Sequence, residues 1–123
     1  MIVSVIGLGL IGGSMAIDLK RRGFADTILG VENDPVNAAA AEKMGLADEI
    51  VPFEESISRA DIIVISVPVG TAVRMLPQIL DQFQKEGANN KIVIDTCSTK
   101  SQIVRCVHYH PYRSRYVSTH PMA

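Results

Sequence analysis

The sequence predicts an α/β fold in which helices cover both faces of a doubly wound parallel sheet, so that the domain has three layers, α/β/α. Short apolar runs rich in β-branched residues recur along the chain, and most are followed by a segment with helical periodicity. The connections between these segments are short, and 123 residues are enough for one domain with one hydrophobic core. We therefore interpret residues 1–123 as a single domain.

The amino-terminal unit is a strand followed by a helix. Residues 2–6 form a β-branched apolar run that ends at a glycine, which is typical of a buried parallel strand. Residues 11–22 then carry apolar side chains at near-helical spacing, with three basic residues in the last turn and Gly23 as a stop signal. We expect a strand over the first range and a helix over the second.

The second unit carries clear helix-start chemistry. Residues 28–32 predict a strand. Asp34 is expected to be the N-cap because its side chain can accept hydrogen bonds from the first turn, and Pro35 suits the first helical position because it has no N–H to satisfy. The helix is expected to continue over residues 37–44.

The rest of the chain continues this alternation. We expect strands over residues 49–51, 61–67, 91–95 and 116–119, helices over residues 53–59, 71–84 and 101–107, and a loop over residues 108–115. Pro77 is expected to kink or divide its helix because proline removes a backbone donor. In such a sheet, ligands bind beyond the carboxyl ends of the strands, where the strand order reverses. The residues that directly follow each strand are therefore the candidates for function.

A glycine loop joins the first strand to the first helix. The segment Gly7-Leu8-Gly9-Leu10-Ile11-Gly12 has the spacing G-x-G-x-x-G. Gly7 suits a tight turn, Gly9 lets a pyrophosphate approach the backbone, and Gly12 lets the helix pack on the sheet. The helix amino terminus adds free N–H groups and partial positive charge, so we predict a Rossmann-type dinucleotide-binding fold; a glycine turn that only packs is the alternative. The predicted cofactor-binding residues here are Gly7, Gly9, Leu10, Ile11 and Gly12.

Glu32 bears on the choice of cofactor. It ends the second strand 20 residues after Gly12, where dinucleotide folds place an acid that binds the adenosine ribose. A carboxylate there accepts hydrogen bonds from both ribose hydroxyls but repels a 2′-phosphate, and no arginine follows in residues 33–35, so NAD is favoured over NADP. An ordinary surface acid is the alternative. The residues expected along the cofactor at the end of the fourth strand are Ser66, Val67 and Pro68, unless that strand merely ends at its proline.

Charge and composition narrow the classes of partner. The formal net charge of −1 argues against nucleic acid, and no apolar run reaches the roughly 18 residues that a membrane helix needs. The amino terminus lacks an export-type leader and Cys97 and Cys106 suit free thiols, so a cytoplasmic location is expected. After Asp95 there are four basic and no acidic side chains, which favours an anionic ligand unless the asymmetry is accidental.

The last third of the chain resembles the prephenate and arogenate dehydrogenase family. The segment from Asp95 to Lys100, DTCSTK, matches that family's D-x-x-S-x-K motif, and the segment from His120 to Ala123 matches its H-P-[MI]-A motif. With the glycine loop, the resemblance covers the whole chain, although Cys97 replaces a more common glycine. It implies that His120 accepts a hydrogen bond from the ring hydroxyl of the substrate. It also implies that Ser98 binds the same hydroxyl or orients the imidazole.

The resemblance further implies an enzyme of tyrosine biosynthesis. Prephenate, a small dicarboxylate, would be oxidised and decarboxylated to 4-hydroxyphenylpyruvate with hydride transfer to NAD. Family members continue into a helical domain that forms a homodimer and completes the substrate site, so a truncated chain that is inactive alone is expected. Arogenate dehydrogenase, another two-domain NAD(P)-dependent dehydrogenase and a stand-alone NAD-binding regulatory module remain alternatives.

Lys100 and the three histidines each have competing interpretations. Lys100 could meet an anion of the substrate or cofactor, or it could be a solvated lysine in the first helical turn. A metal site that combines His108, His110 and His120 is not expected, because no nearby cysteine or carboxylate completes the ligands.

Overall fold

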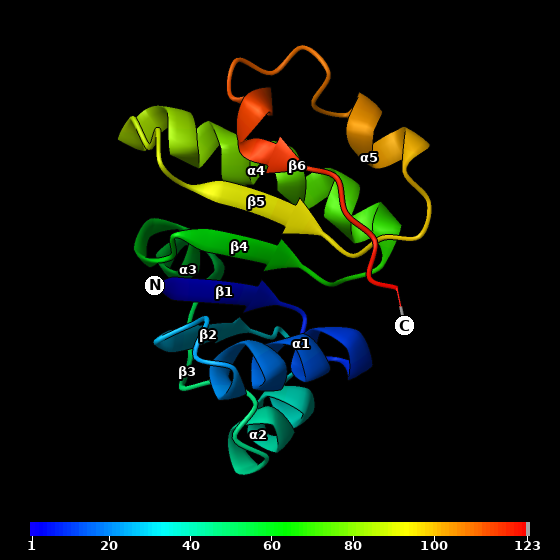
Figure 1. Ribbon diagram of the computed structural model, residues 1–123. Coiled ribbons are helices and arrows are strands. Elements are labelled where there is room, and N and C mark those ends of the chain that lie inside the picture. Colours follow the sequence, from blue (N-terminus) through cyan, green and yellow to red (C-terminus); the bar gives the residue numbers. More distant parts are fainter. Residues whose placement is uncertain (123) are drawn as a thin grey trace.

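Six parallel strands lie in the spatial order β3-β2-β1-β4-β5-β6, with helices on both sides (Figure 1). The computed structural model describes residues 1–122. Its strands are β1 (Ile2–Ile6), β2 (Thr27–Val31), β3 (Glu49–Ile50), β4 (Ile62–Ile65), β5 (Ile92–Asp95) and β6 (Tyr116–Val117). Its helices are α1 (Leu10–Arg21), α2 (Pro35–Lys43), α3 (Phe53–Arg59), α4 (Val69–Glu86) and α5 (Ser101–Arg105), with a 3₁₀ turn at Arg113–Arg115.

This arrangement confirms the predicted fold class. Strand β1 lies at the centre and pairs with both β2 and β4, so the chain winds outward from it in two directions. The strand order reverses between β1 and β4, and that is where a doubly wound sheet leaves a crevice at its carboxyl edge. The Asp34 side chain accepts hydrogen bonds from the N–H groups of Val36 and Asn37, as expected of the N-cap of α2.

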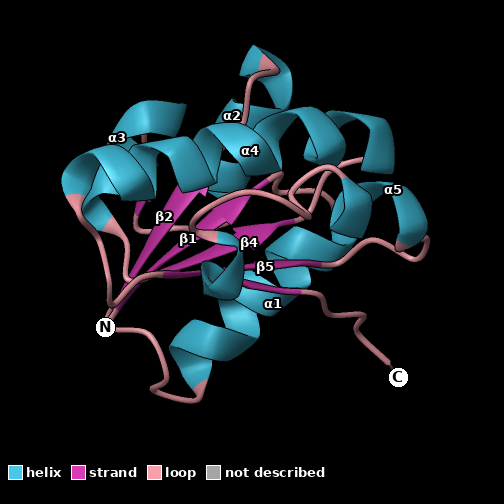
Figure 2. Cartoon of the chain, turned by 90° about the horizontal axis from the view of Figure 1, so that it is seen from above, coloured by secondary structure: helices cyan, strands magenta, loops and turns pink. Residues whose placement is uncertain are grey.

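Two apolar cores hold the layers together. Residues of α1 and α2 pack on one face of the sheet, and residues of α3, α4 and α5 pack on the other. Figure 2 shows α1 across the sheet from α3 and α4. Both faces of the central strands β1 and β4 are therefore buried, which explains why isoleucine and valine fill these strands without polar alternation, except at the buried Ser4 of β1.

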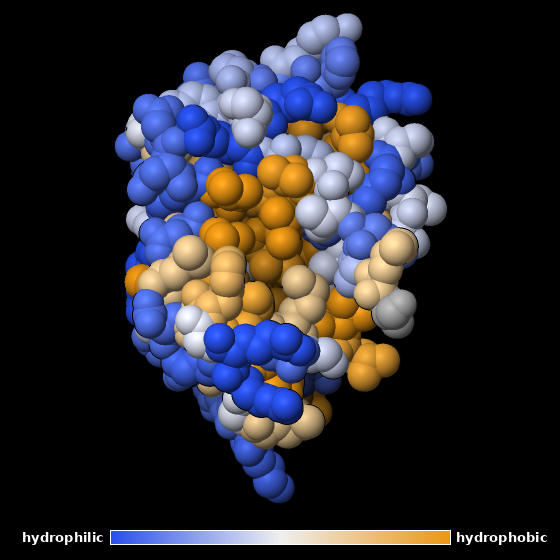
Figure 3. Space-filling model, in the orientation of Figure 1, coloured by the Kyte–Doolittle hydropathy of each residue, from blue (hydrophilic) through white to orange (hydrophobic). Residues whose placement is uncertain are grey.

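One face of β5 and β6 carries apolar side chains that remain accessible. On the side of the sheet that α1 covers, register places Ile92 beside Ile62, and Ile94 beside Val117. Ile92 is 37% exposed and Val117 is 48% exposed. Figure 3 shows an apolar patch over this part of the molecule. Helices α1 and α2 thus cover the β1–β3 half of this face and leave the other half open.

Helix α4 runs unbroken through Pro77, so the predicted division of this helix is wrong. Loss of one backbone hydrogen bond and the proline ring clash cost roughly 3 kcal/mol in a helix. Packing opposes this cost, because Leu76, Ile79, Leu80 and Phe83 are fully buried and each contributes about 1.5–3 kcal/mol. In residues 1–122, no helix has both the length and the apolar character needed to cross a bilayer.

If this packing maintains α4, Leu76→Ala should lower the free energy of unfolding by about 2–5 kcal/mol, because it removes a buried side chain and leaves a cavity. Urea denaturation followed by circular dichroism measures the change. Gln78→Ala, on the exposed side of the same helix, is the matched control and should change it by less than about 0.5 kcal/mol. Equal losses in both variants would contradict the assignment.

Candidate functional site

Two adjoining cavities occupy the carboxyl edge of the sheet where the strand order reverses. The larger, about 390 Å³, lies between the start of α1 and the ends of β4 and β5, and Ser98 is among its walls. The smaller, about 260 Å³, lies toward β2 and includes Glu32. Gly9 and residues 66–68 line both cavities. Together they form a groove that crosses the sheet edge from Glu32 to Ser98.

The structure gathers most of the predicted site residues around this groove. The predicted cofactor-binding residues that line one or both cavities are Gly7, Gly9, Leu10, Ile11, Glu32, Ser66, Val67 and Pro68. Gly12 lies below the groove, where it packs against Gly7 and Ser66. The walls also include residues that sequence reasoning missed, among them Thr71, Met75, Thr96 and Cys97. Thr96 and Cys97 lie in the motif from Asp95 to Lys100 directly after a strand, which was the available signal, whereas no local pattern marks Thr71 and Met75 inside α4.

Glycine occupies the three motif positions of the loop for different structural reasons. Gly7 adopts φ +90°, and a Cβ there would lie 2.4 Å from the carbonyl oxygen of Ser66. A Cβ on Gly12 would lie 2.0 Å from the carbonyl oxygen of Gly7. Gly9 has φ −73°, and a Cβ there would meet no atom within 4 Å. The fold itself therefore requires Gly7 and Gly12, whereas Gly9 leaves open space above the backbone.

The amino terminus of α1 faces the larger cavity without a capping side chain. Its N-cap is Gly9, and no side chain accepts a hydrogen bond from its first turn. The first N–H groups of a helix have no partner within the helix and carry partial positive charge. Leu10 and Ile11 line the mouth of the cavity with side chains that are 89% and 48% exposed. This end of the groove therefore offers backbone donors flanked by apolar surface.

The backbone orients the carboxylate of Glu32. One oxygen accepts a hydrogen bond from the N–H of Leu8 at 3.3 Å, and the other accepts one from the N–H of Asp34 at 3.2 Å. Since each carboxylate oxygen can accept more than one hydrogen bond, acceptor capacity remains toward the groove. The half-buried side chain thus presents a fixed negative charge at one end of the site.

The ends of β4 and β5 are joined by hydroxyl groups. The Thr96 hydroxyl lies 3.2 Å from Oγ of Ser66 and 3.4 Å from the carbonyl oxygen of Ile65. Ser66 also packs against Gly12 of α1. The floor of the groove is therefore held in place from β5 through β4 to the first helix.

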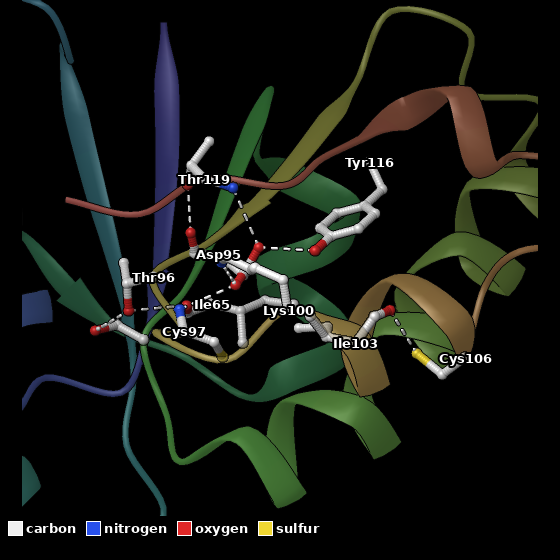
Figure 4. Close-up of polar contacts among 10 residues, drawn as sticks. Ile65, Asp95, Thr96, Cys97, Lys100, Ile103, Cys106, Tyr116 and Thr119 are labelled. Carbon is white, nitrogen blue, oxygen red and sulfur yellow. Dashed lines mark hydrogen bonds and ion pairs between the residues drawn. The ribbon is translucent and has the colours of Figure 1, made fainter.

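Asp95 is the centre of a buried polar cluster beside the larger cavity (Figure 4). Its fully buried carboxylate accepts hydrogen bonds from the N–H of Cys97 at 2.9 Å and from the hydroxyl of Tyr116 at 2.8 Å. It also accepts a hydrogen bond from the N–H of Thr119 at 3.4 Å and forms an ion pair with Lys100. The Thr119 hydroxyl donates to the carbonyl oxygen of Asp95. Two segments that follow different strands are thus tied to one side chain.

Burial and hydrogen bonding act in opposite directions on the pKa of Asp95. Desolvation raises it, but the hydrogen bonds from Lys100, Tyr116 and Cys97 outweigh desolvation and hold the pKa below its usual range. Burial and the adjacent Asp95 carboxylate raise the pKa of Tyr116, so its hydroxyl keeps its proton and remains a donor. The cluster is therefore an ionised carboxylate surrounded by donors.

The ion pair changes the interpretation of the basic tail. Lys100 is directed to Asp95, and this agrees with neither the anion-binding nor the solvated-lysine interpretation. The positive balance counted after Asp95 includes this neutralised lysine, so it overstates the charge available to a ligand. A lone carboxylate at the end of an apolar strand, five residues before a lysine, was the signal that could have predicted the pair.

Of the two predicted catalytic residues, one lines the groove and the other does not. Ser98 is exposed and lines the larger cavity. His120 is exposed and lines neither cavity, but it follows Thr119, which is anchored to Asp95. Within residues 1–122 no hydrogen bond joins Ser98 to His120. The tail after β6 passes the carboxyl end of β5 (Figure 1), and Ala123, the last residue of the predicted motif, lies outside the described residues.

The two cysteines and His110 have structural surroundings. Cys97 and Cys106 are free thiols, and burial raises the pKa of both, which disfavours the reactive thiolate. His110 lies between Asp81, 2.9 Å from its Nε2, and the N–H of Tyr112, which donates to its Nδ1. In the part of the chain that the structure describes, no three His, Cys, Asp or Glu side chains group as metal ligands.

The chain matches proteins of one family along most of its length. The family described as "Prephenate dehydrogenase, nucleotide-binding domain" matches residues 15–123. A prephenate dehydrogenase from Lactococcus lactis subsp. cremoris is 33% identical over 123 residues, which cover 98% of this chain and 34% of that protein. This chain therefore spans about a third of the length of that curated relative.

Solved structures of two relatives have the same architecture. Prephenate dehydrogenase from A. aeolicus, in complex with hydroxyphenyl propionate and NAD⁺, superposes with a TM-score of 0.78 at 26% identity, covering 99% of this chain and 42% of that chain. Arogenate dehydrogenase from Synechocystis superposes with a TM-score of 0.75 at 27% identity, covering 98% and 41%.

The lowered pKa of Asp95 predicts acid sensitivity. Because the folded-state pKa lies below the unfolded value, the ionised carboxylate stabilises the fold above the unfolded pKa, and this contribution is lost as the pH falls through the folded pKa. In Asp95→Asn, the free energy of unfolding should therefore depend less on pH below about pH 4 than in the parent chain. Urea denaturation between about pH 2 and pH 7 measures this, with Asp18→Asn on the exposed surface of α1 as control. The same pH dependence in all three proteins would contradict it.

Proposed function

The chain belongs to the family of prephenate dehydrogenase nucleotide-binding domains, and from this we propose that it forms the NAD-binding part of an enzyme that oxidises and decarboxylates prephenate to 4-hydroxyphenylpyruvate. The observation that carries the proposal is the groove at the reversal of strand order, with an oriented carboxylate at one end and Ser98 at the other. Tyrosine biosynthesis is the corresponding pathway.

The residues around the groove fit a dinucleotide. The uncapped N–H groups of α1 and the open space above Gly9 suit the pyrophosphate, because phosphates bind at helix amino termini where no side chain intervenes. The Glu32 carboxylate suits the two hydroxyls of the adenosine ribose and would repel a 2′-phosphate, which favours NAD over NADP. Residues 66–68 and Ser98 would then lie toward the nicotinamide end. When bound, NAD supplies a hydride acceptor.

Ser98 and His120 are proposed to act on the ring hydroxyl of the substrate. As hydride leaves the hydroxyl-bearing carbon, positive charge develops there. A neutral imidazole of His120 would accept the hydroxyl proton and stabilise that charge, while Ser98 would hold the hydroxyl in place. Departure of the carboxylate as carbon dioxide leaves its bonding electrons in the ring, which becomes aromatic. Ser98 lines the groove, and His120 follows Thr119, whose N–H donates to Asp95 at the end of β5.

The rest of the catalytic apparatus is proposed to lie in the length that the relatives have beyond this chain. Among residues 1–122, no cationic residue lines the groove to pair with the substrate carboxylates. A helical domain that supplies such residues and forms a homodimer is consistent with the family resemblance, as is a cytoplasmic location. On this proposal, the 123-residue chain alone binds NAD but has little turnover.

Arogenate is the second candidate substrate. The structural likeness to the Synechocystis arogenate dehydrogenase supports it, and arogenate differs from prephenate only in the side chain. The ring hydroxyl, which Ser98 and His120 are proposed to contact, is common to both substrates. The two candidates are therefore distinguished by assay.

Joining this chain to the remaining part of the Lactococcus relative tests the function. The joined protein should form NADH with prephenate, and His120→Asn should lower kcat by about 10²–10⁴-fold while leaving the KM for NAD nearly unchanged. His108→Asn, in the exposed loop before β6, is the control and should retain activity. Preference for arogenate would move the assignment to the second candidate, and full activity of His120→Asn would remove the proposed role of His120.

Glu32→Ser tests the cofactor assignment in the 123-residue chain. Loss of a charged acceptor should weaken NAD binding by about tenfold or more and narrow its advantage over NADP. Isothermal titration with each cofactor measures both effects. Asp34→Ser is the matched control, because serine preserves the N-cap of α2 while removing a neighbouring carboxylate. An unchanged preference in Glu32→Ser would contradict the assignment.

A further inference from the structure

We propose that Asp95 is a positioning residue that sets the location of Ser98 relative to His120. The inference rests on the proposed function, in which these two residues act on one substrate hydroxyl. It goes further by assigning a role to a side chain that touches neither cavity.

The two oxygens of the Asp95 carboxylate serve different segments. Oδ2 accepts the N–H of Cys97 and pairs with Lys100, which lie on either side of Ser98. Oδ1 accepts the hydroxyl of Tyr116 and the N–H of Thr119, the residue before His120. One rigid planar group therefore holds the loop that carries Ser98 on one side and the tail that carries His120 on the other (Figure 4).

The sheet alone does not position these segments. The β5–β6 ladder pairs Val93 with Tyr116 and Ile94 with Val117, and both candidate residues lie beyond it. Past Val117, the tail is held through Thr119, whose N–H donates to the Asp95 carboxylate and whose hydroxyl donates to the backbone carbonyl oxygen of the same residue. In the described residues, Asp95 is thus the point through which the two segments are connected.

The chemistry of the cluster requires a carboxylate. All of the groups directed at Asp95 are donors, and an ionised carboxylate is acceptor-only on both oxygens. An asparagine would direct its NH₂ group at donors on one of the two sides. Because the side chain is fully buried, an unmade hydrogen bond there is not replaced by bulk water. Asp95→Asn should therefore release at least one segment.

Amide hydrogen exchange followed by NMR on the 123-residue chain tests the inference. In Asp95→Asn, exchange at Cys97 and Thr119 should rise by about tenfold or more beyond any change at the core amides of β1 and β4. The signals of the Ser98 amide and the His120 imidazole should shift. NAD affinity should change less than these exchange rates, because the Glu32 carboxylate is held by the N–H groups of Leu8 and Asp34 and not by the Asp95 cluster.

Asp48→Asn is the matched control. Asp48 also binds a backbone N–H, that of Ile28 at 2.7 Å, and a lysine, Lys20 at 2.9 Å, but it directly precedes β3, the edge strand at the other side of the sheet from β6. Its replacement should alter exchange near residues 28 and 48 and leave residues 97–100 and 116–120 unchanged. If Asp48→Asn loosened those segments as much as Asp95→Asn did, the effect would be general destabilisation and the proposal would fail.

Two further variants test the two carboxylate oxygens of Asp95 one at a time. Both remain informative if Asp95→Asn does not fold. Tyr116→Phe removes a donor to Oδ1 and should increase exchange at Thr119 more than at Cys97. Lys100→Met removes the ion-pair partner of Oδ2 and should increase exchange at Cys97 more than at Thr119. Equal changes at both segments in both variants, or none, would overturn the positioning role.

A kinetic measurement keeps this inference distinct from the proposed function. In the joined protein, Tyr116→Phe should lower kcat by about tenfold with an unchanged KM for NAD, since it disturbs the tail but not the cofactor groove. A joined protein inactive on both prephenate and arogenate would refute the proposed function. The exchange pattern would still decide whether Asp95 couples the two segments.

Discussion

The close approach of α1 to the ends of β1 and β4 determines where a ligand can bind to this chain. Gly12 lies so near Gly7 and Ser66 that any side chain there would overlap the backbone. This contact places the amino terminus of α1 directly over the carboxyl edge of the sheet, beside the reversal of strand order. The groove, its free backbone donors and the open space above Gly9 all follow from it.

Two carboxylates at this edge of the sheet differ in burial and in the groups that surround them. Glu32 is half-buried, is held by two backbone N–H groups and faces the groove. Asp95 is fully buried, and its negative charge is paired with Lys100 and hydrogen-bonded by neighbouring donors. The first is suited to bind a ligand and the second to hold chain segments in place. Among residues 1–122, none that lines the groove is a lysine or arginine, so the charge that the groove itself presents is that of Glu32.

Most secondary structure could be predicted because it depends on nearby residues. The strand at Ile2–Ile6, the N-cap at Asp34 and the stop at Gly23 follow from local periodicity and turn chemistry. The disagreements occur where tertiary contacts outweigh local preference. Burial keeps α4 continuous through Pro77. The last strand is shorter than predicted, because Thr119 bonds to Asp95 instead of continuing the ladder.

The sequence by itself determined the fold class. It also identified the glycine loop, the acid at Glu32 and the motifs that contain Ser98 and His120, because each is encoded by residue types at short spacing. The tertiary structure decided which strand ends meet, that Thr96 and Cys97 line the groove, and that Lys100 is bound to Asp95. It also decided that Asp95 contacts Tyr116 and Thr119, which are 21 and 24 residues away in sequence. Contacts of that kind depend on the order of strands in the sheet and on the burial of the side chains between them, and neither is a property of any short segment.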